Sequence, residues 1–195
     1  IVVAYANTFS VPFVFDDIAA VTRNPSLSSF ARAFVPPDGL SVTGRPLVNL
    51  SLALNHALSG TNPWSYHALN LMLHAASALL LLGVVRRAQT ASAGTAVPNA
   101  ANTIAGWTAL VWAVHPLQSA SVTYVMQRSE LLAGFCLLAA LYAFARTVEK
   151  GKPDTRGPQA VPWAAVAVTA TFAGMASKEV MAGAPLVLLL YDRTF

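Results

Sequence analysis

Two adjacent carboxylates, Asp16 and Asp17, are the first residues of this chain that could do chemistry. They follow an apolar segment, Ile1 to Phe15, that contains no charged residue. An ionised carboxylate costs roughly several kcal/mol to hold near hydrocarbon unless it is paired, hydrated or used. One interpretation is that the pair ends an apolar segment in interfacial water. The other is proton abstraction, because close carboxylates raise one another's pKa and a base works best near the ambient pH.

Further polar residues accompany the ends of the later apolar segments. Their members are Arg45, His67, Asn70, His74, His115, Arg128, Glu130, Lys178 and Glu179. Each has a structural explanation when it is taken singly. His67, Asn70 and His74 share one helix face, which favours interhelical hydrogen bonds of about 0.6 kcal/mol each. A metal site would need a different spacing or a further ligand, so no metal is expected here.

The four charged residues of the last two polar segments are expected to pair locally. We expect interfacial ion pairs between Arg128 and Glu130 and between Lys178 and Glu179, with long stems that reach toward water. Ser177 is a candidate cap for a helix that begins near Glu179, where the helix dipole favours an acid.

The composition indicates an integral membrane protein. Of the 195 residues, 55% are hydrophobic and only 10% are charged, whereas soluble domains carry about 25% charged residues. The formal charge of +4 comes from scattered bases, which excludes a nucleic-acid partner of the usual basic-patch kind. The single cysteine excludes an intrachain disulfide. No phosphate-binding loop, nucleophile elbow or zinc-protease motif supports a soluble hydrolase.

Run lengths predict an all-α, polytopic helix bundle with five to six spans. A spanning helix needs about 20 apolar residues. We therefore interpret 1–15 as the end of a first span that follows a missing beginning, in a fragment of a longer protein. The other expected spans are 64–87, 102–117, 130–147, 161–177 and 180–192.

The segment 16–63 is expected to be an outer loop rather than a span. Turn signals such as Asn24-Pro25 and Pro36-Pro37-Asp38-Gly39 divide it into short pieces. Two pieces, near 26–35 and 45–59, have apolar patterns but are too short to cross a bilayer. We expect both to be interfacial helices.

Loop charges predict the orientation. One side is expected to hold seven bases: Arg86, Arg87, Arg146, Lys150, Lys152, Arg156 and Arg193. The other side holds five: Arg23, Arg32, Arg45, Arg128 and Lys178. The positive-inside tendency assigns the seven to the cytoplasm. The Asp16-Asp17 loop, the His115-Pro116 turn and Lys178-Glu179 then share the outer, periplasmic or lumenal side.

The order of short motifs resembles a known family. These motifs are Phe-Asp-Asp at 15–17, Arg23-Asn24-Pro25, Gly44-Arg45-Pro46-Leu47, Leu54-Asn55, Tyr66-His67 with Asn70 and His74, His115-Pro116-Leu117-Gln118, Val122-Thr123-Tyr124 with Gln127-Arg128, Ser177-Lys178-Glu179 and Leu190-Tyr191-Asp192. Together they resemble the membrane half of the TMTC family, transmembrane proteins with C-terminal tetratricopeptide repeats. The wording around Tyr124 is closest to bacterial members.

This resemblance implies a GT-C-like fold and a glycosyltransferase. Such enzymes transfer a sugar from a polyprenyl phosphate to an acceptor hydroxyl, here of a protein or glycan, at the periplasmic or lumenal face of a bacterial inner membrane or the endoplasmic reticulum. An acid of the first outer loop acts as base, which matches Asp16 best and Asp17 second. Arg128, Lys178 and Arg45 are candidates for the leaving phosphate, because charge develops there. His67, Asn70, His115, Glu130 and Glu179 are expected to support the site, and a divalent cation is left open.

Two alternatives to the enzyme remain at this point. A transporter or flippase would use buried polar residues as a substrate path, but it predicts polar groups at mid-membrane and inverted repeats, and the sequence has no visible repeat. A non-catalytic anchor for a repeat scaffold leaves the polar residues of the outer face without a purpose. The chain also departs from animal TMTC proteins after His115-Pro116, where Gln118-Ser119-Ala120 stands in place of an acid. The resemblance therefore does not assign the sugar.

Overall fold

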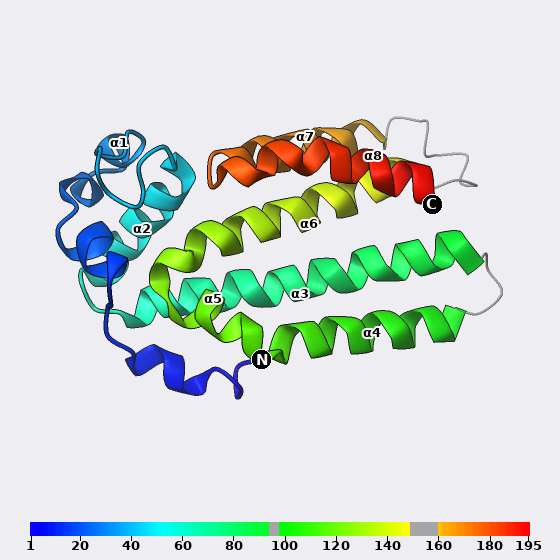
Figure 1. Ribbon diagram of the computed structural model, residues 1–195, viewed down its shortest axis with the longest axis horizontal. Helices are drawn as coiled ribbons and strands as arrows, with labels where there is room; N and C mark the ends of the chain where they lie inside the picture. The colour runs from blue at the N-terminus through cyan, green and yellow to red at the C-terminus, as the bar shows by residue number, and fades with distance from the viewer. Residues whose placement is uncertain (94–97, 149–159) are drawn as a thin grey trace.

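The computed structural model describes residues 1–93, 98–148 and 160–195, and every regular element in these ranges is helical (Figure 1). The predicted cytoplasmic bases Lys150, Lys152 and Arg156 lie outside the described residues. The α-helices are α1 (Phe30–Ala33), α2 (Pro46–Ser59), α3 (Trp64–Ala93), α4 (Pro98–Val114), α5 (Ser119–Thr123), α6 (Arg128–Val148), α7 (Ala160–Met175) and α8 (Ala184–Thr194). This confirms the all-α class.

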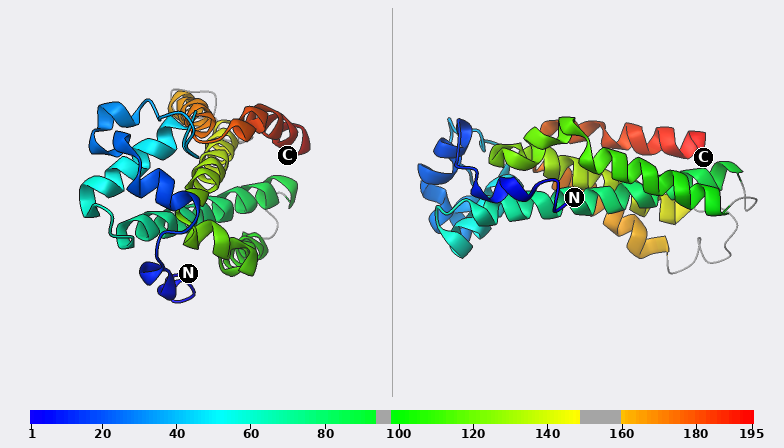
Figure 2. Two further views of the ribbon diagram at one scale, coloured as in Figure 1. Left: turned by 60° about the vertical axis from the view of Figure 1, so that its left-hand side comes forward. Right: turned by 90° about the horizontal axis from the view of Figure 1, so that it is seen from below.

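The longest helices, α3 and α6, run side by side along the molecule, and α4, α7 and α8 flank them (Figures 1 and 2). Within the described residues, two stretches are both long and apolar enough to cross a bilayer, Trp64–Ala91 and Val125–Val148. They correspond to the spans predicted at 64–87 and 130–147. The helices α4, α7 and α8 have 17, 16 and 11 residues, fewer than the roughly 20 that span hydrocarbon without adjustment.

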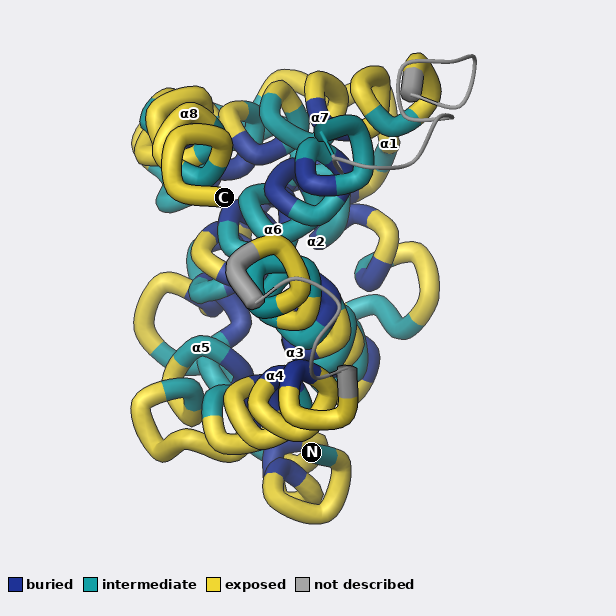
Figure 3. Tube along the Cα trace, turned by 90° about the vertical axis from the view of Figure 1, so that its right-hand side faces the viewer, coloured by how far each residue is buried: buried dark blue, intermediate teal, exposed yellow. Residues whose placement is uncertain are grey.

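Burial follows this arrangement. The facing sides of α3 and α6 are buried, whereas the outer faces of α4 and α8 are exposed (Figure 3). Large apolar side chains cover these outer faces, including Trp107 on α4 and Leu186 on α8. Exposed apolar side chains gathered on a helix face are typical of a surface that contacts lipid or another protein.

The segment before α3 forms a compact block over one end of the bundle (Figure 1). Its core includes Val21, Leu27, Val42, Val48 and Leu52, all at most 3% exposed. The piece predicted near 26–35 is a 3-10 turn, Pro25–Ser28, followed by the one-turn α1. The piece predicted near 45–59 is α2, which begins at Pro46 and ends before Gly60. Gly60 has φ +58°, a conformation that side chains with a Cβ adopt at a cost.

The segment 1–15 differs from the expected end of a spanning helix. Its regular structure is one 3-10 helix, Ala6–Ser10, and the chain is extended at Val11. Polar side chains in this stretch bond to the nearby backbone, as Ser10 Oγ does to the Asn7 carbonyl, and Pro12 lacks an N–H. Both features oppose a continuous α-helix. The later helix ends also shift, since α4 ends at Val114, before the predicted 117, and α8 begins at Ala184, after the predicted 180.

Candidate functional site

The two carboxylates of the first loop have opposite surroundings. Asp17 is 1% exposed, and its Oδ1 and Oδ2 accept hydrogen bonds from the backbone N–H groups of Met126 at 2.8 Å and Val14 at 3.3 Å. Burial raises the pKa of the Asp17 carboxyl, although these N–H groups act in the other direction. Asp16 is exposed. Asp17 therefore ties the loop to the start of α6, and Asp16 is the carboxylate that faces solvent.

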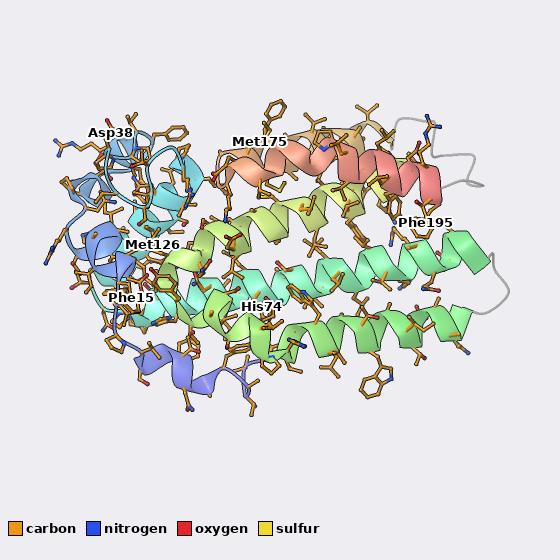
Figure 4. The ribbon with its side chains drawn as sticks, in the orientation of Figure 1. Phe15, Asp38, His74, Met126, Met175 and Phe195 are labelled. Atoms are coloured by element: carbon orange, nitrogen blue, oxygen red, sulfur yellow. The ribbon has the colours of Figure 1, made fainter. Side chains whose placement is uncertain are left out.

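The backbone around Asp16 is held in an uncommon geometry. Phe15 has φ +48°, the one non-glycine residue with positive φ among those described, and its ring is 85% exposed. The backbone N–H of Asp16 donates to the Tyr124 hydroxyl at 3.3 Å. Strained residues of this kind are concentrated at functional sites. Figure 4 shows Phe15 beside Met126, at the end of the bundle that the N-terminal block covers.

Tyr124 is a site residue that the sequence interpretation missed. Its hydroxyl lies against Asp16, and burial together with the charges of Asp16 and Asp17 raises its pKa, although the Asp16 N–H lowers it. The phenol therefore stays protonated at neutral pH. Tyr124 belongs to the Val-Thr-Tyr motif noted in the sequence. A tyrosine in an apolar segment, however, gives no reason to expect a contact with Asp16, which is 108 positions away.

Arg128 is completely buried and joins three helices. Its Nε donates to Asn70 Oδ1 at 2.8 Å, one terminal nitrogen donates to Asn55 Oδ1 at 2.6 Å and Ser51 Oγ at 3.4 Å, and the other donates to the Tyr66 carbonyl at 2.7 Å. These acceptors come from α2 and α3, while Arg128 begins α6. Because four of its five N–H groups are used in this way, its position argues against the phosphate contact predicted for it.

Charged residues from three segments meet next to this point. Lys178 forms an ion pair with Glu130, and Arg45 lies 3.7 Å from Glu179. The backbone N–H of Leu47 donates to the Ala176 carbonyl at 3.2 Å, which holds the start of α2 against the end of α7. The structure thus brings Arg45, Lys178, Glu130 and Glu179 together at one end of the bundle.

The local pairings expected within this group are wrong. Lys178 pairs with Glu130 rather than with its neighbour Glu179, and Glu179 pairs with Arg45. The backbone of Lys178 is extended, so the side chains of Lys178 and Glu179 point to opposite sides. Ser177 does not cap the following turn either, since its hydroxyl donates to the Ala173 carbonyl one turn earlier. The backbone N–H of Glu179 and then Arg45 lower the pKa of the Glu179 carboxyl.

The polar residues of α3 hold neighbouring segments in place. His67 Nε2 is 2.9 Å from the Val11 carbonyl, and His74 Nε2 is 2.8 Å from the Ala113 carbonyl. Asn70 donates to the carbonyls of Val122 and Tyr124 at 3.4 and 3.3 Å. The bonds to Ala113 in α4 and Val122 in α5 are interhelical, as the sequence favours, whereas Val11 and Tyr124 lie in extended segments. In the part of the chain that the structure describes, no group of three or more His, Cys, Asp or Glu side chains could hold a metal ion.

Two neighbouring hollows lie near the end of α4 and the turn that follows it. The larger, of about 650 Å³, is lined mainly by apolar side chains such as Trp107 and Leu117, and by the exposed His115. The smaller, of about 130 Å³, contains Glu130 and Ser121. Trp112 and Gln118 line both hollows, and the lining of the smaller one includes Glu130, the carboxylate that pairs with Lys178. His115 Nδ1 accepts a hydrogen bond from the Leu117 N–H and thereby fixes the turn beside the larger hollow.

Comparison with known proteins found similar sequences. No family model and no solved structure matches the chain. The chain is 32% identical over 183 residues to Protein O-mannosyl-transferase Tmtc3 of Drosophila melanogaster, 31% over 173 residues to TMTC2 of Mus musculus, and 30% over 184 residues to TMTC3 of Homo sapiens. The matches cover 83%, 82% and 89% of this chain.

The chain is TMTC-like. It spans only about a fifth of the length of these relatives, 18% to 19%. The similarity therefore concerns one segment of the longer proteins, and their names describe those proteins as protein O-mannosyl-transferases.

Proposed function

We propose that this chain is part of a membrane glycosyltransferase that moves a sugar from a polyprenyl phosphate to a hydroxyl of a protein acceptor. The observation that carries the proposal is the difference between the two acids of the pair. The Asp17 carboxylate accepts two backbone hydrogen bonds, whereas Asp16 is exposed beside Tyr124. The names of the similar proteins support an enzyme that glycosylates protein.

In this mechanism Asp16 is the general base. Its carboxylate removes the proton of the acceptor hydroxyl as the oxygen attacks C1 of the sugar, and the bond from C1 to the phosphate oxygen breaks. The polyprenyl phosphate leaves with the electron pair of that bond. A positioned base contributes roughly 10²- to 10⁴-fold to such a step. The fixed backbone at Phe15 and the Tyr124 contact hold Asp16 in one position.

The leaving phosphate needs a cation, and Lys178 fits this role better than Arg128. Lys178 is partly exposed and shares its charge with a single carboxylate, Glu130, next to the smaller hollow. Arg45 is the second candidate, because it is also partly exposed and its partner Glu179 is largely solvated. Arg128 instead positions the helices that carry these groups. A divalent cation at the phosphate is compatible with this scheme, although the described residues form no group of three His, Cys, Asp or Glu side chains that would hold one.

The apolar hollow suits the lipid part of the donor. Its walls at Trp107, Val111 and Leu117 are exposed on the side of α4, where a polyprenyl chain can reach from the bilayer. We place this end of the bundle on the periplasmic or lumenal side of the membrane, because the bases at the other end of α3 and α6 favour the cytoplasm. An inner membrane of a bacterium is the proposed location.

The test is sugar transfer by the full-length protein in liposomes. Radiolabelled polyprenyl-phosphate mannose and an acceptor protein are supplied, and label on protein is measured. We expect transfer, and we expect Lys178→Ala to raise the KM for the donor because a phosphate contact exists before and during the reaction. Arg32→Ala, an exposed arginine of α1, is the control. Absence of transfer from every polyprenyl-phosphate sugar tried would contradict the proposal.

A further inference from the structure

A second polar site lies at the end of α3 and α6 that is distant from Asp16. It is a hollow of about 710 Å³ between these helices. Arg86, Arg87 and Arg146 line one part of it, and apolar side chains such as Leu79 and Phe135 line the rest. The volume lies within the range of about 300–1,000 Å³ that small-molecule sites occupy.

The arginines are held by aromatic rings rather than by carboxylates. The Arg87 guanidinium lies 4.5 Å from the centre of the Tyr142 ring, and that of Arg146 lies 4.8 Å from the Trp163 ring. Tyr142 and Trp163 contact each other edge to face at 6.0 Å. Stacking fixes a guanidinium plane and leaves its N–H edges for a ligand.

The close approach of Tyr142 to α3 is built into the sequence. A Cβ placed on Gly83 would lie 2.6 Å from the Tyr142 ring, so only glycine leaves room for the ring at this position. Arg87 follows Gly83 by four residues, one helical turn along the same face. The ring therefore seats against the helix directly below the guanidinium that it stacks on.

In the described part of the chain, no ion pair offsets the charge of these arginines, and the Nε of Arg87 is buried without a hydrogen-bond partner. The C-terminal ends of helices carry partial negative charge, so the arginines, and not the helix ends, would attract an anion. A buried donor without a partner favours a ligand that accepts hydrogen bonds.

We propose that this hollow binds the phosphate headgroup of an anionic phospholipid, with the first part of an acyl chain along its apolar wall. The ligand chemistry is a phosphodiester joined to hydrocarbon, which matches arginines at the end of the bundle and leucine and phenylalanine farther along it. Bidentate contacts from guanidinium groups suit phosphate oxygens. Positioned this way, the lipid would fix the cytoplasmic ends of α3 and α6 relative to one another.

Native mass spectrometry of the full-length protein in neutral detergent tests this site. The protein is titrated with phosphatidylglycerol and, separately, with phosphatidylcholine. We expect preferential binding of phosphatidylglycerol, lost by roughly fivefold for each arginine replaced. The test variant is R87Q/R146Q, and the matched control is R23Q/R32Q, which removes the same charge from exposed positions in the N-terminal block. Arg86→Gln is compared with Arg32→Gln, since both arginines are exposed and either change should fold.

Three results would overturn the proposal. Equal binding of phosphatidylglycerol and phosphatidylcholine would indicate adsorption without headgroup recognition. Equal losses in the test and control variants would indicate attraction to net charge alone. Displacement of the lipid by millimolar inorganic phosphate would indicate a site for free phosphate. The lipid site is supported if phosphatidylglycerol binding is lost only in the variants of Arg86, Arg87 and Arg146, and if inorganic phosphate does not displace the lipid from the wild type.

Discussion

Arg128 is the residue on which most of the hydrogen bonds between α2, α3 and α6 depend. Its replacement by methionine keeps much of the volume but leaves the buried Oδ1 atoms of Asn55 and Asn70 without the Arg128 donor, and the Tyr66 carbonyl loses one of its donors. Each unsatisfied buried group costs about 1–3 kcal/mol. We therefore expect Arg128→Met to lower the free energy of unfolding by about 3 kcal/mol or more, measured by denaturant unfolding in detergent micelles.

The control for this prediction is Arg32→Met, at an exposed site of α1. It removes the same charge and should change the free energy of unfolding by less than about 0.5 kcal/mol. If both substitutions have the same small effect, Arg128 is not the structural link described above.

The burial of Asp17 predicts how the free energy of unfolding depends on pH. Burial raises its pKa above the value of 3.8 that it has in an unfolded chain, so the folded state holds its proton more tightly. Between the unfolded and the folded pKa the unfolded chain therefore binds fewer protons, and the free energy of unfolding falls as pH rises through this window. Asp17→Asn cannot titrate. We expect the stability of the wild type relative to Asp17→Asn to decrease from about pH 4 upward, in thermal unfolding at stepped pH.

The opposite trend would contradict this assignment. If the wild type gains stability relative to Asp17→Asn as pH rises, the N–H groups of Val14 and Met126 outweigh burial, and the folded pKa is lowered. Asp38→Asn is the control, because Asp38 is exposed.

At the scale of elements, α6 and α7 pack so closely that one glycine decides the contact. A Cβ on Gly174 would lie 2.4 and 2.9 Å from Met181 atoms and 3.1 Å from the Cys136 Cβ. The methionine end can move, but the Cys136 backbone cannot follow easily. We expect Gly174→Ala to lower the free energy of unfolding by about 1–3 kcal/mol through overpacking.

Gly106→Ala is the matched control for this contact. Gly106 also lies within a helix, and a Cβ there would meet nothing within 4 Å. Alanine is a better helix former by up to about 1 kcal/mol, so this substitution should be neutral or stabilising in the same unfolding experiment. Equal destabilisation by both changes would mean that the packing of α7 on α6 is looser than described.

The elements that the sequence predicted well are those with long apolar runs or clear stops. The runs that became α3 and α6 needed no tertiary information, and Pro46 and Gly60 bound α2 by local geometry. Residues 1–15 form turns and one 3-10 helix instead of the expected α-helical end of a span, and apolar content alone could not distinguish the two; Tyr5 anchors the segment to the Ala113 carbonyl.

The sequence predicted which residues lie near one another in the candidate site better than it predicted which of them form ion pairs or hydrogen bonds. The predicted order of the spans placed Arg45, Glu130, Lys178 and Glu179 on one side of the bundle. Their pairing depends on the extended backbone at Lys178, which the residue types do not predict. The different roles of Asp16 and Asp17 also depend on tertiary contacts. In the sequence the two aspartates are equivalent, and in the structure only Asp17 accepts the hydrogen bond of the Met126 N–H.

At the scale of the whole molecule, the placement of the N-terminal block and the α4–α5 turn predicts a shared side of the membrane. Cysteines are introduced singly at Asp38, Ser119 and Thr90 in a Cys136→Ala background, because Cys136 is the one cysteine of these 195 residues. All three positions are exposed. We expect a membrane-impermeant thiol reagent to label 38 and 119 from the outer side, and 90 only after the membrane is opened.

Two outcomes of the labelling would contradict this topology. Labelling of 38 and 119 from different sides would place the acidic loop and the His115-Pro116 turn apart. Labelling of 90 together with 38 would place both ends of α3 on one side, and α3 would then not cross the membrane.

The central claim is that the exposed acid of the pair is the base of a sugar transfer carried out at this end of the molecule. Asp16→Asn keeps the size of the side chain and removes its ability to accept a proton, while the bond from its backbone N–H to Tyr124 remains available. Asp38→Asn is the matched control, an exposed acid in the same N-terminal block (Figure 4). Both variants should unfold at the wild-type temperature.

The decisive measurement is kcat for transfer from polyprenyl-phosphate mannose to protein by the full-length Asp16→Asn and Asp38→Asn variants in liposomes. We predict that Asp16→Asn lowers kcat by roughly 10²- to 10⁴-fold and that Asp38→Asn transfers at the wild-type rate. Transfer by Asp16→Asn at a rate near that of the wild type, with the fold intact, would contradict the claim.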